Sequence, residues 1–312
     1  MALLPPFFLD TVVAIGVGDD PGKRKWVGTG FILGKFLEVT PDKKEKRYQL
    51  WLITNKHVLV DFKAVYIKFN SAQDPQSKDY KVQLVAKNGR PRWVGHPLDA
   101  VDVTAIFLNL GFLKAEGRRF AYFQSDSHTM NKEKMRAAGI TEGDRVFVLG
   151  FPMGLVAAER QYVICRGGYV ARVRDFLENR TSEFLVDVTV FPGNSGGPVI
   201  LCPSALAIQG TNTIKNADLI GIVKAYVPYT DMAISQQTQR PRILFEENSG
   251  LAAVESVDSI IETVELAARR LEGRAAQARS RAKKRQEEIP TEQSVVGDGV
   301  PAAPEPPCTS SA

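Results

Sequence analysis

The 312-residue chain contains little cysteine and little histidine, with three residues of each. The cysteines are widely spaced and form no Cys-x-x-Cys pair, which excludes a disulfide framework and indicates a reducing compartment. Cys165 and Cys202 fall within apolar runs, so we interpret them as small buried side chains. The scarcity of histidine also keeps the search for a catalytic base short.

Long apolar runs are missing as well. No uncharged stretch reaches about 18 residues with the apolar content that a bilayer requires. The first ten residues are apolar, but they include two prolines, reach an aspartate early and lack a basic segment, so they make a poor export signal. We therefore expect neither a signal peptide nor a transmembrane segment, and a cytoplasmic location.

The net charge of the chain does not identify a binding partner. A formal net charge of +5 does not require nucleic acid. Residues 269–285 are basic but include no aromatic side chain for base stacking. This stretch could bind an acidic partner, pair with itself, or be a solvated helix face. We expect no metal, no other cofactor and no membrane partner.

Short strand-like runs separated by turn residues dominate the first 227 residues. This pattern predicts an all-β fold of antiparallel barrels, and two barrels of about six strands each fit the length. We place the first barrel in residues 1–125 and the second in 126–257, with a short helix near 131–138. The expected strands are 11–17, 26–33, 36–40, 47–54, 64–69, 81–87, 102–109, 145–150, 162–173, 183–190, 199–202 and 219–227.

The character of the sequence changes after residue 228. Residues 230–242 are expected to form a polar loop, and 250–254 one last strand. Apolar residues recur at near-helical spacing from 258 to 271, which predicts a C-terminal helix over 258–288 that is basic in its second half. Residues 289–312 are rich in Pro, Ala, Ser and Glu and are expected to be a disordered tail.

The run Gly-Asn-Ser-Gly-Gly-Pro at 193–198 lies between two of the expected strands. Glycine can adopt backbone conformations closed to other residues, so the N–H groups of Gly193 and Ser195 can point at one spot. There they would stabilise the oxyanion formed when Ser195 attacks a carbonyl. We therefore predict an oxyanion hole in the turn of Gly193, Asn194 and Ser195. The alternative is a glycine-rich hairpin with an incidental serine.

A serine hydroxyl is a weak nucleophile and needs a neighbouring base. His57 follows an apolar strand, from which a loop can project it into a cleft between barrels, whereas His96 and His128 lie in polar segments and remain alternatives. Asp102 directly precedes an apolar strand and can fix the tautomer of the imidazole, with Asp99 as the alternative. Both aspartates could also simply cap that strand.

Four segments together resemble the trypsin-like serine peptidases and, within them, the bacterial HtrA/Deg-like branch. They are GTGFIL at 28–33, LITNKHV at 52–58, DVTAI at 102–106 and DVTVFPGNSGGPV at 187–199. The resemblance implies a chymotrypsin-type double barrel with a triad of His57, Asp102 and Ser195 in its cleft. It also implies a serine endopeptidase that hydrolyses polypeptides through an acyl-enzyme.

The chain departs from the family pattern at several points. Thr104 stands where alanine is usual, and Val58 replaces the cysteine of secreted digestive members, so their disulfide is absent. No Ile-Val-Gly-Gly activation site is present. The residues after 270 are too few and too polar for the PDZ domain of HtrA proteases, so PDZ-dependent regulation is not implied.

The resemblance also places Thr189, Ala225 and Tyr226 near the primary specificity pocket, although Tyr226 could instead belong to the core. No acid stands at position 189, which argues against a preference for Lys or Arg and leaves small or medium apolar side chains. Two other functions remain open. One is a latent or non-catalytic binding or sensor module that a partner activates, and the other is an esterase of small molecules.

Overall fold

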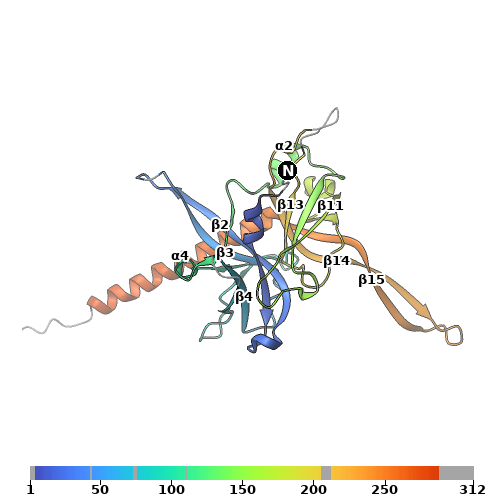
Figure 1. The fold of residues 1–312 in the computed structure, drawn as a ribbon, viewed down its shortest axis with the longest axis horizontal. Helices are drawn as coiled ribbons and strands as arrows, with labels where there is room; N and C mark the ends of the chain where they lie inside the picture. The colour runs from blue at the N-terminus through green and yellow to red at the C-terminus, as the bar shows by residue number, and fades with distance from the viewer. Residues whose placement is uncertain (1–3, 43, 73–75, 110, 205–211, 288–312) are drawn as a thin grey trace, which may run out of the picture. The chain divides into compact units, whose positions relative to one another are not determined.

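A computed structural model describes residues 4–42, 44–72, 76–109, 111–204 and 212–287 (Figure 1). The chain divides into two units, residues 1–269 and 270–312. All strands lie in the first unit, which consists of a half-barrel, a closed six-stranded barrel and the start of a helix. The two-barrel, all-β architecture predicted from the sequence is therefore confirmed. The tail predicted for 289–312 lies outside the described residues.

The half-barrel is a nine-stranded sheet in the order β5-β4-β1-β2-β3-β7-β6, with β8 paired to β4 and β9 to β2. Its core consists of aliphatic side chains from the inner face, including the fully buried Val13, Ile32 and Leu52. The two runs predicted at 26–33 and 36–40 form one long strand. The strands are β1 Val12–Val17, β2 Lys25–Val39, β3 Lys46–Thr54, β4 Ala64–Ser71, β5 Lys78–Gln83, β6 Val94–Gly95, β7 Thr104–Phe107, β8 Arg118–Arg119 and β9 Phe123–Gln124.

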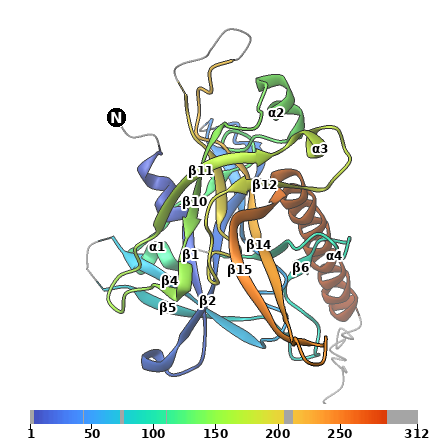
Figure 2. The same ribbon diagram turned by 90° about the vertical axis from the view of Figure 1, so that its right-hand side faces the viewer.

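The closed barrel has the strand order β10-β11-β12-β15-β14-β13 (Figure 2). Alternate residues such as Val146, Val148, Val186 and Val254 point inward and form its core. The turn that carries the predicted nucleophile joins β12 to β13. The strands are β10 Arg145–Gly150, β11 Ile164–Arg172, β12 Glu183–Asp187, β13 Pro198–Leu201, β14 Leu219–Ile234 and β15 Pro241–Ser256.

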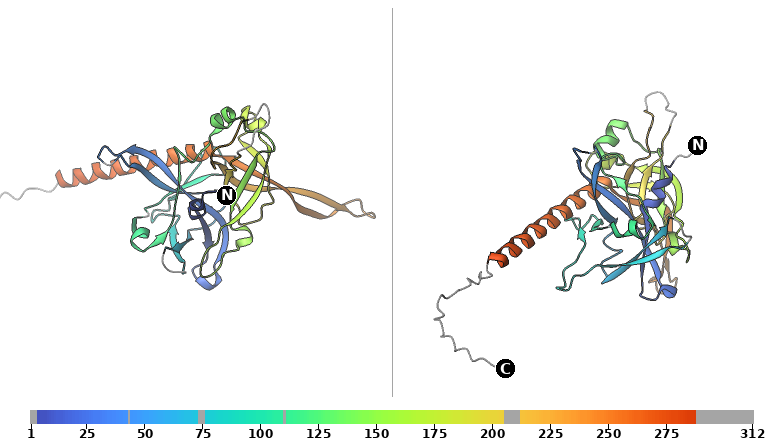
Figure 3. Two further views of the ribbon diagram at one scale, coloured as in Figure 1. Left: turned by 45° about the horizontal axis from the view of Figure 1, so that its top comes forward. Right: turned by 60° about the vertical axis from the view of Figure 1, so that its left-hand side comes forward.

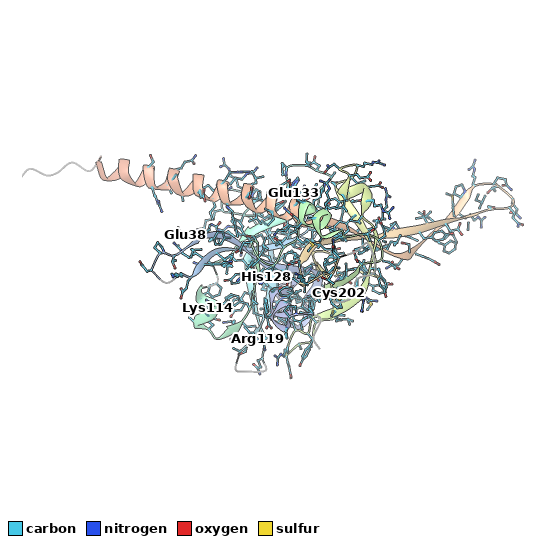
Figure 4. All side chains as sticks on the ribbon, turned by 90° about the horizontal axis from the view of Figure 1, so that it is seen from above. Glu38, Lys114, Arg119, His128, Glu133 and Cys202 are labelled. Atoms are coloured by element: carbon cyan, nitrogen blue, oxygen red, sulfur yellow. The ribbon has the colours of Figure 1, made fainter. Side chains whose placement is uncertain are left out.

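The polar loop predicted for 230–242 is wrong. Strands β14 and β15 stay paired beyond the barrel, from Tyr229 opposite Glu247 to Ala233 opposite Ile243. The resulting hairpin extends away from the barrel in Figure 1 and in the left panel of Figure 3, and its side chains stand clear of the barrel in Figure 4. None of its residues from 228 to 249 is buried. Without a buried face, its sequence carries no apolar alternation to identify the strands.

The helices are short except for the last. The predicted helix near 131–138 is α2, which Asn131 caps by accepting a hydrogen bond from the Lys134 N–H at 3.0 Å. The last helix, α4, begins at Val257, beside the predicted start. No helix of the described residues is long and apolar enough to span a membrane. The helical elements are α1 Gly111–Ala115, α2 Lys132–Ala138, α3 Arg174–Leu177 and α4 Val257–Glu287, with 3-10 turns at Pro6–Thr11, Pro21–Lys23 and Pro152–Gly154.

Glu142 connects the segment before β10 to the start of α3. Figure 2 shows α3 next to α2. Glu142 Oε1 accepts hydrogen bonds from the backbone N–H groups of Val173 at 3.0 Å and Arg174 at 3.2 Å. Burial raises the pKa of Glu142, but these N–H groups outweigh it and lower the pKa from 4.5 to about 2. The charged form is thus the one that the fold stabilises.

This contact predicts a specific loss of stability in acid. Because the folded-state pKa lies below that of the unfolded chain, the stabilisation by Glu142 is fully present above pH 4.5 and is lost as the pH falls toward 2. Urea unfolding measured across this range should show a smaller acid-induced loss in Glu142→Gln than in the natural protein. Equal losses in the two proteins would contradict the assignment.

Candidate active site

The turn before β13 has a backbone that only glycine adopts without strain. Gly193 has a φ of +100°, and a Cβ there would lie 2.4 Å from the carbonyl oxygen of Phe151. Gly196 has a φ of +86°, and a Cβ there would meet the Thr29 carbonyl oxygen at 1.9 Å. The glycines on both sides of Ser195 therefore fix the path of the chain and its packing against β2.

Two carbonyl groups of this turn are held by backbone donors. The Pro192 oxygen accepts the Met153 N–H at 2.6 Å, and the Asn194 oxygen accepts the Gly197 N–H at 2.8 Å. No described peptide bond is cis, so the N–H groups of Gly193 and Ser195 point away from these bonded carbonyls. Neither N–H has an acceptor among the described residues. The turn thus presents two free donors beside the serine.

Thr29 connects this turn to the half-barrel. Its fully buried hydroxyl donates to the Gly193 carbonyl at 2.6 Å and accepts the Phe151 N–H at 3.1 Å. The Thr29 N–H donates to the Ser195 carbonyl at 2.9 Å. Sequence reasoning assigned no site role to Thr29, because its partners lie more than 100 residues away along the chain.

Asn194 shapes the turn from within. Its buried side chain accepts the Phe191 N–H through Oδ1 at 3.1 Å, while its own N–H donates to the Phe191 carbonyl at 2.9 Å. This reciprocal pair closes the turn immediately before Ser195. Asn194 therefore organises the predicted oxyanion hole through its side chain, whereas the free donors belong to its two neighbours.

His57 and Asp102 are in direct contact. The imidazole Nδ1 lies 2.5 Å from Asp102 Oδ2, and Asp102 Oδ1 accepts the N–H groups of Lys56 at 2.7 Å and His57 at 3.2 Å. Burial raises the pKa of Asp102, but the contacts with His57 and Lys56 outweigh it and lower the pKa. An ionised Asp102 accepts a proton-bearing Nδ1, which leaves the lone pair of the imidazole on Nε2.

The Ser195 hydroxyl donates to the carbonyl oxygen of Lys224 on β14 at 3.2 Å. Within the described residues it has no hydrogen bond to His57. The structure thus brings His57 and Asp102 together and attaches Ser195 to the neighbouring strand. Serine–histidine contacts are often long before substrate binds, so this arrangement is compatible with a catalytic pair.

The alternative residues have other partners. His96 is buried, and its Nε2 lies 3.0 Å from a Glu262 carboxylate oxygen. His128 accepts the Gln124 N–H through Nδ1 at 3.1 Å, and burial lowers its pKa. Asp99 is exposed. Among the described residues, none of the three bonds to Ser195, so the geometry favours His57 and Asp102.

The three residues proposed for the specificity pocket differ in exposure. Thr189 and Ala225 are exposed, whereas Tyr226 is partly buried against the barrel core. The Tyr226 hydroxyl donates to Glu246 on the opposite strand of the hairpin at 2.5 Å. Tyr226 therefore has a packing role whether or not it contacts substrate. In the described part of the chain, no group of His, Cys, Asp and Glu side chains is arranged to hold a metal ion.

Comparison with known proteins identifies the family. A family model described as a trypsin-like peptidase domain matches residues 28–204, which is more than half of the chain. The chain belongs to this family. The matched residues of this trypsin-like peptidase domain include His57, Asp102 and Ser195. A search of curated proteins finds no match.

Among solved structures, the trypsin-like peptidase domain is similar to kallikrein-related peptidase 10 in complex with Zn²⁺. The sequence identity is 12% and the TM-score is 0.42, with 85% of this chain and 98% of the other chain covered.

The Thr29 hydroxyl is expected to hold the glycine turn. Thr29→Val keeps the shape of the side chain but leaves the Gly193 carbonyl and the Phe151 N–H unpaired in the interior, so the free energy of unfolding should fall by about 2 kcal/mol or more. Thr29→Ser retains the hydroxyl and should lose about 1 kcal/mol through the missing methyl group. Urea unfolding distinguishes the two, and an equal loss in both variants would contradict the role of the hydroxyl.

Proposed function

We propose that this trypsin-like peptidase domain is a serine endopeptidase, with Ser195 as nucleophile, His57 as general base and Asp102 as the carboxylate that orients it. The observation that carries the proposal is the pair of free N–H groups on Gly193 and Ser195, beside a serine and a His57–Asp102 contact of 2.5 Å. A catalytic turn needs such donors before substrate arrives, because donors already in place do not have to reorganise during the reaction.

In this proposal Ser195 Oγ attacks the carbonyl carbon of a peptide bond and its proton passes to His57 Nε2. The N–H groups of Gly193 and Ser195 stabilise the oxyanion, and the imidazolium then protonates the leaving amine as the C–N bond breaks. Water, deprotonated by the same imidazole, attacks the acyl-enzyme. As the bond between Ser195 Oγ and the acyl carbon breaks, the His57 imidazolium returns its proton to Oγ, and the new carboxylic acid leaves and ionises in water.

The motifs of the sequence support an HtrA/Deg-like, bacterial member of the family. The substrate is an extended polypeptide, and Thr189, Ala225 and Tyr226 contact the side chain on the acyl side of the cleaved bond. Position 189 carries no acid, so this pocket favours small or medium apolar side chains over Lys or Arg.

A second candidate is a latent module that a partner activates. The observation that favours it is the Ser195 hydroxyl, which donates to the Lys224 carbonyl rather than to His57. In a latent enzyme this bond would persist until a partner moved β14 or the His57 loop. The basic stretch at 269–285 could bind an acidic partner or a second copy of the chain.

A fluorophosphonate probe separates the two candidates, because it reacts only with a serine that has a base and an oxyanion hole. We expect a single adduct in the intact mass of the natural protein and none in Ser195→Ala or His57→Ala. Both variants should unfold at the temperature of the natural protein within a few degrees, since neither side chain is fully buried.

The absence of an adduct on the folded natural protein would reject the active-enzyme proposal and favour the latent module. An adduct that survives Ser195→Ala would show that another residue reacts, and would reject the assignment of the nucleophile.

A further inference from the structure

We propose that Glu255 on β15 is a positioning residue for Asp102, and that Lys224 holds the Glu255 carboxylate in place. This inference rests on the proposed function, since it assigns a role in the same site. Neither residue belongs to the motifs that predict the triad, and together with Glu183 they form a charge cluster next to the site.

Glu255 reaches Asp102 from the other half of the molecule. Its Oε1 accepts the Asp102 N–H at 2.9 Å, and the carbonyl of Asp102 accepts the Asn55 side chain at 2.6 Å. The backbone of Asp102 is therefore held on both sides of its Cα, by the barrel on one side and by the half-barrel on the other. A residue fixed in this way presents its carboxylate to His57 with little freedom.

The surroundings of the Glu255 carboxylate are unfavourable for an acid. Glu255 is fully buried, and its second oxygen, Oε2, has no hydrogen-bond donor among the described residues. In the pairing of β12 with β15 it lies directly opposite Glu183, another acid. Like charges in such a pair repel, and a buried carboxylate without a cation is costly. A purely structural position would be filled more favourably by an apolar residue.

Lys224 supplies the cation. Its Nζ lies 3.0 Å from Glu255 Oε1, 2.9 Å from Glu183 Oε2 and 3.0 Å from the carbonyl oxygen of Ala100. Burial lowers the pKa of Lys224, but the two carboxylates outweigh it and raise the pKa. Lys224 is thus a persistent cation between two acids, and it also contacts the loop that leads into Asp102.

A β-bulge gives Lys224 its double contact. The pairing of β14 with β15 shifts between Val223 and Ala225, and Lys224 is the extra residue. A bulge redirects both the side chain and the peptide group of the inserted residue. As a result the Lys224 carbonyl accepts the Ser195 hydroxyl at 3.2 Å while its ammonium contacts Glu255. Lys224 therefore contacts Ser195 through its backbone carbonyl and Glu255 through its ammonium group.

The negative charge also has a chemical consequence. The ionisable residues around Asp102 are Glu255 from β15, Lys224 from β14, and Lys56 and His57 from the loop after β3, with Glu183 of β12 on the far side of Lys224. Glu255 is the acid of this set that contacts Asp102 directly, and its negative charge lies behind Asp102 as seen from His57. This charge favours the imidazolium that forms when His57 takes the proton of Ser195.

Three variants test the inference. Glu255→Leu removes both the acceptor for the Asp102 N–H and the charge, Glu255→Gln keeps an acceptor and removes only the charge, and Glu183→Gln is the matched control. Glu183 contacts the same lysine but has no contact with Asp102 among the described residues. Each protein is treated with a fluorophosphonate over a range of concentrations and pH values, which separates the maximal labelling rate from half-saturation.

We expect Glu255→Leu to lower the maximal labelling rate about 10- to 100-fold with half-saturation unchanged, because a misplaced Asp102 affects the reaction rather than the binding of the probe. Glu255→Gln should recover most of this rate at its optimum, with the acid side of its pH profile moved toward lower pH. Glu183→Gln should label like the natural protein. The inference would be overturned if Glu255→Leu kept the maximal labelling rate and pH profile of the natural protein. It would also be overturned if Glu183→Gln lost as much of the labelling rate as Glu255→Leu.

A proton NMR measurement keeps the test independent of hydrolysis and of gross unfolding. The proton between His57 Nδ1 and Asp102 gives a signal at unusually low field when their contact is short. This signal should be present in the natural protein and in Glu183→Gln, and shifted or lost in a Glu255→Leu variant whose circular dichroism is unchanged. A natural protein that shows the signal but takes no probe would reject the proposed function alone, whereas an unchanged signal in Glu255→Leu would reject the positioning role.

Discussion

The orientation of two peptide groups is the constraint on which the site depends. The carbonyl oxygens of Pro192 and Asn194 are bonded to backbone donors, so the N–H groups of Gly193 and Ser195 must point the other way. A side chain at position 193 would collide with Phe151, so only glycine permits this arrangement. The turn thereby has its donors in place in the absence of any ligand, which is the condition for electrostatic stabilisation of a transition state.

Two other contacts of the site cross between the two halves of the first unit. Thr29 of the half-barrel holds the Gly193 turn of the barrel, and Glu255 of the barrel holds the Asp102 backbone beside the half-barrel. Each half thus positions a residue that belongs to the other. The candidate catalytic groups stay aligned only while the two halves remain packed, so a loss of this packing would also change the geometry of the site.

Local sequence patterns indicate the proposed triad but not the residues that hold it in place. The proposed roles of Ser195, His57 and Asp102 came from local signals, namely glycine neighbours for the serine and positions at the ends of apolar strands for the other two. Thr29 and Glu255 were not predictable, because their partners lie 164 and 153 residues away along the chain. The hairpin strands also escaped prediction, since strand patterns depend on a buried face and this ribbon has none.

The hairpin gives β14 a mechanical property. The strand that bonds the Ser195 hydroxyl continues past the barrel as one side of a two-stranded ribbon, with Lys224 ten residues before its end at Ile234. At a rise of about 3.3 Å per residue, this is a lever of about 33 Å. A second register shift, between Tyr226 and Pro228, lies between Lys224 and the free part of the ribbon. A bend or twist applied at the tip is therefore passed along β14, through this irregularity, toward the peptide group that accepts the Ser195 hydroxyl.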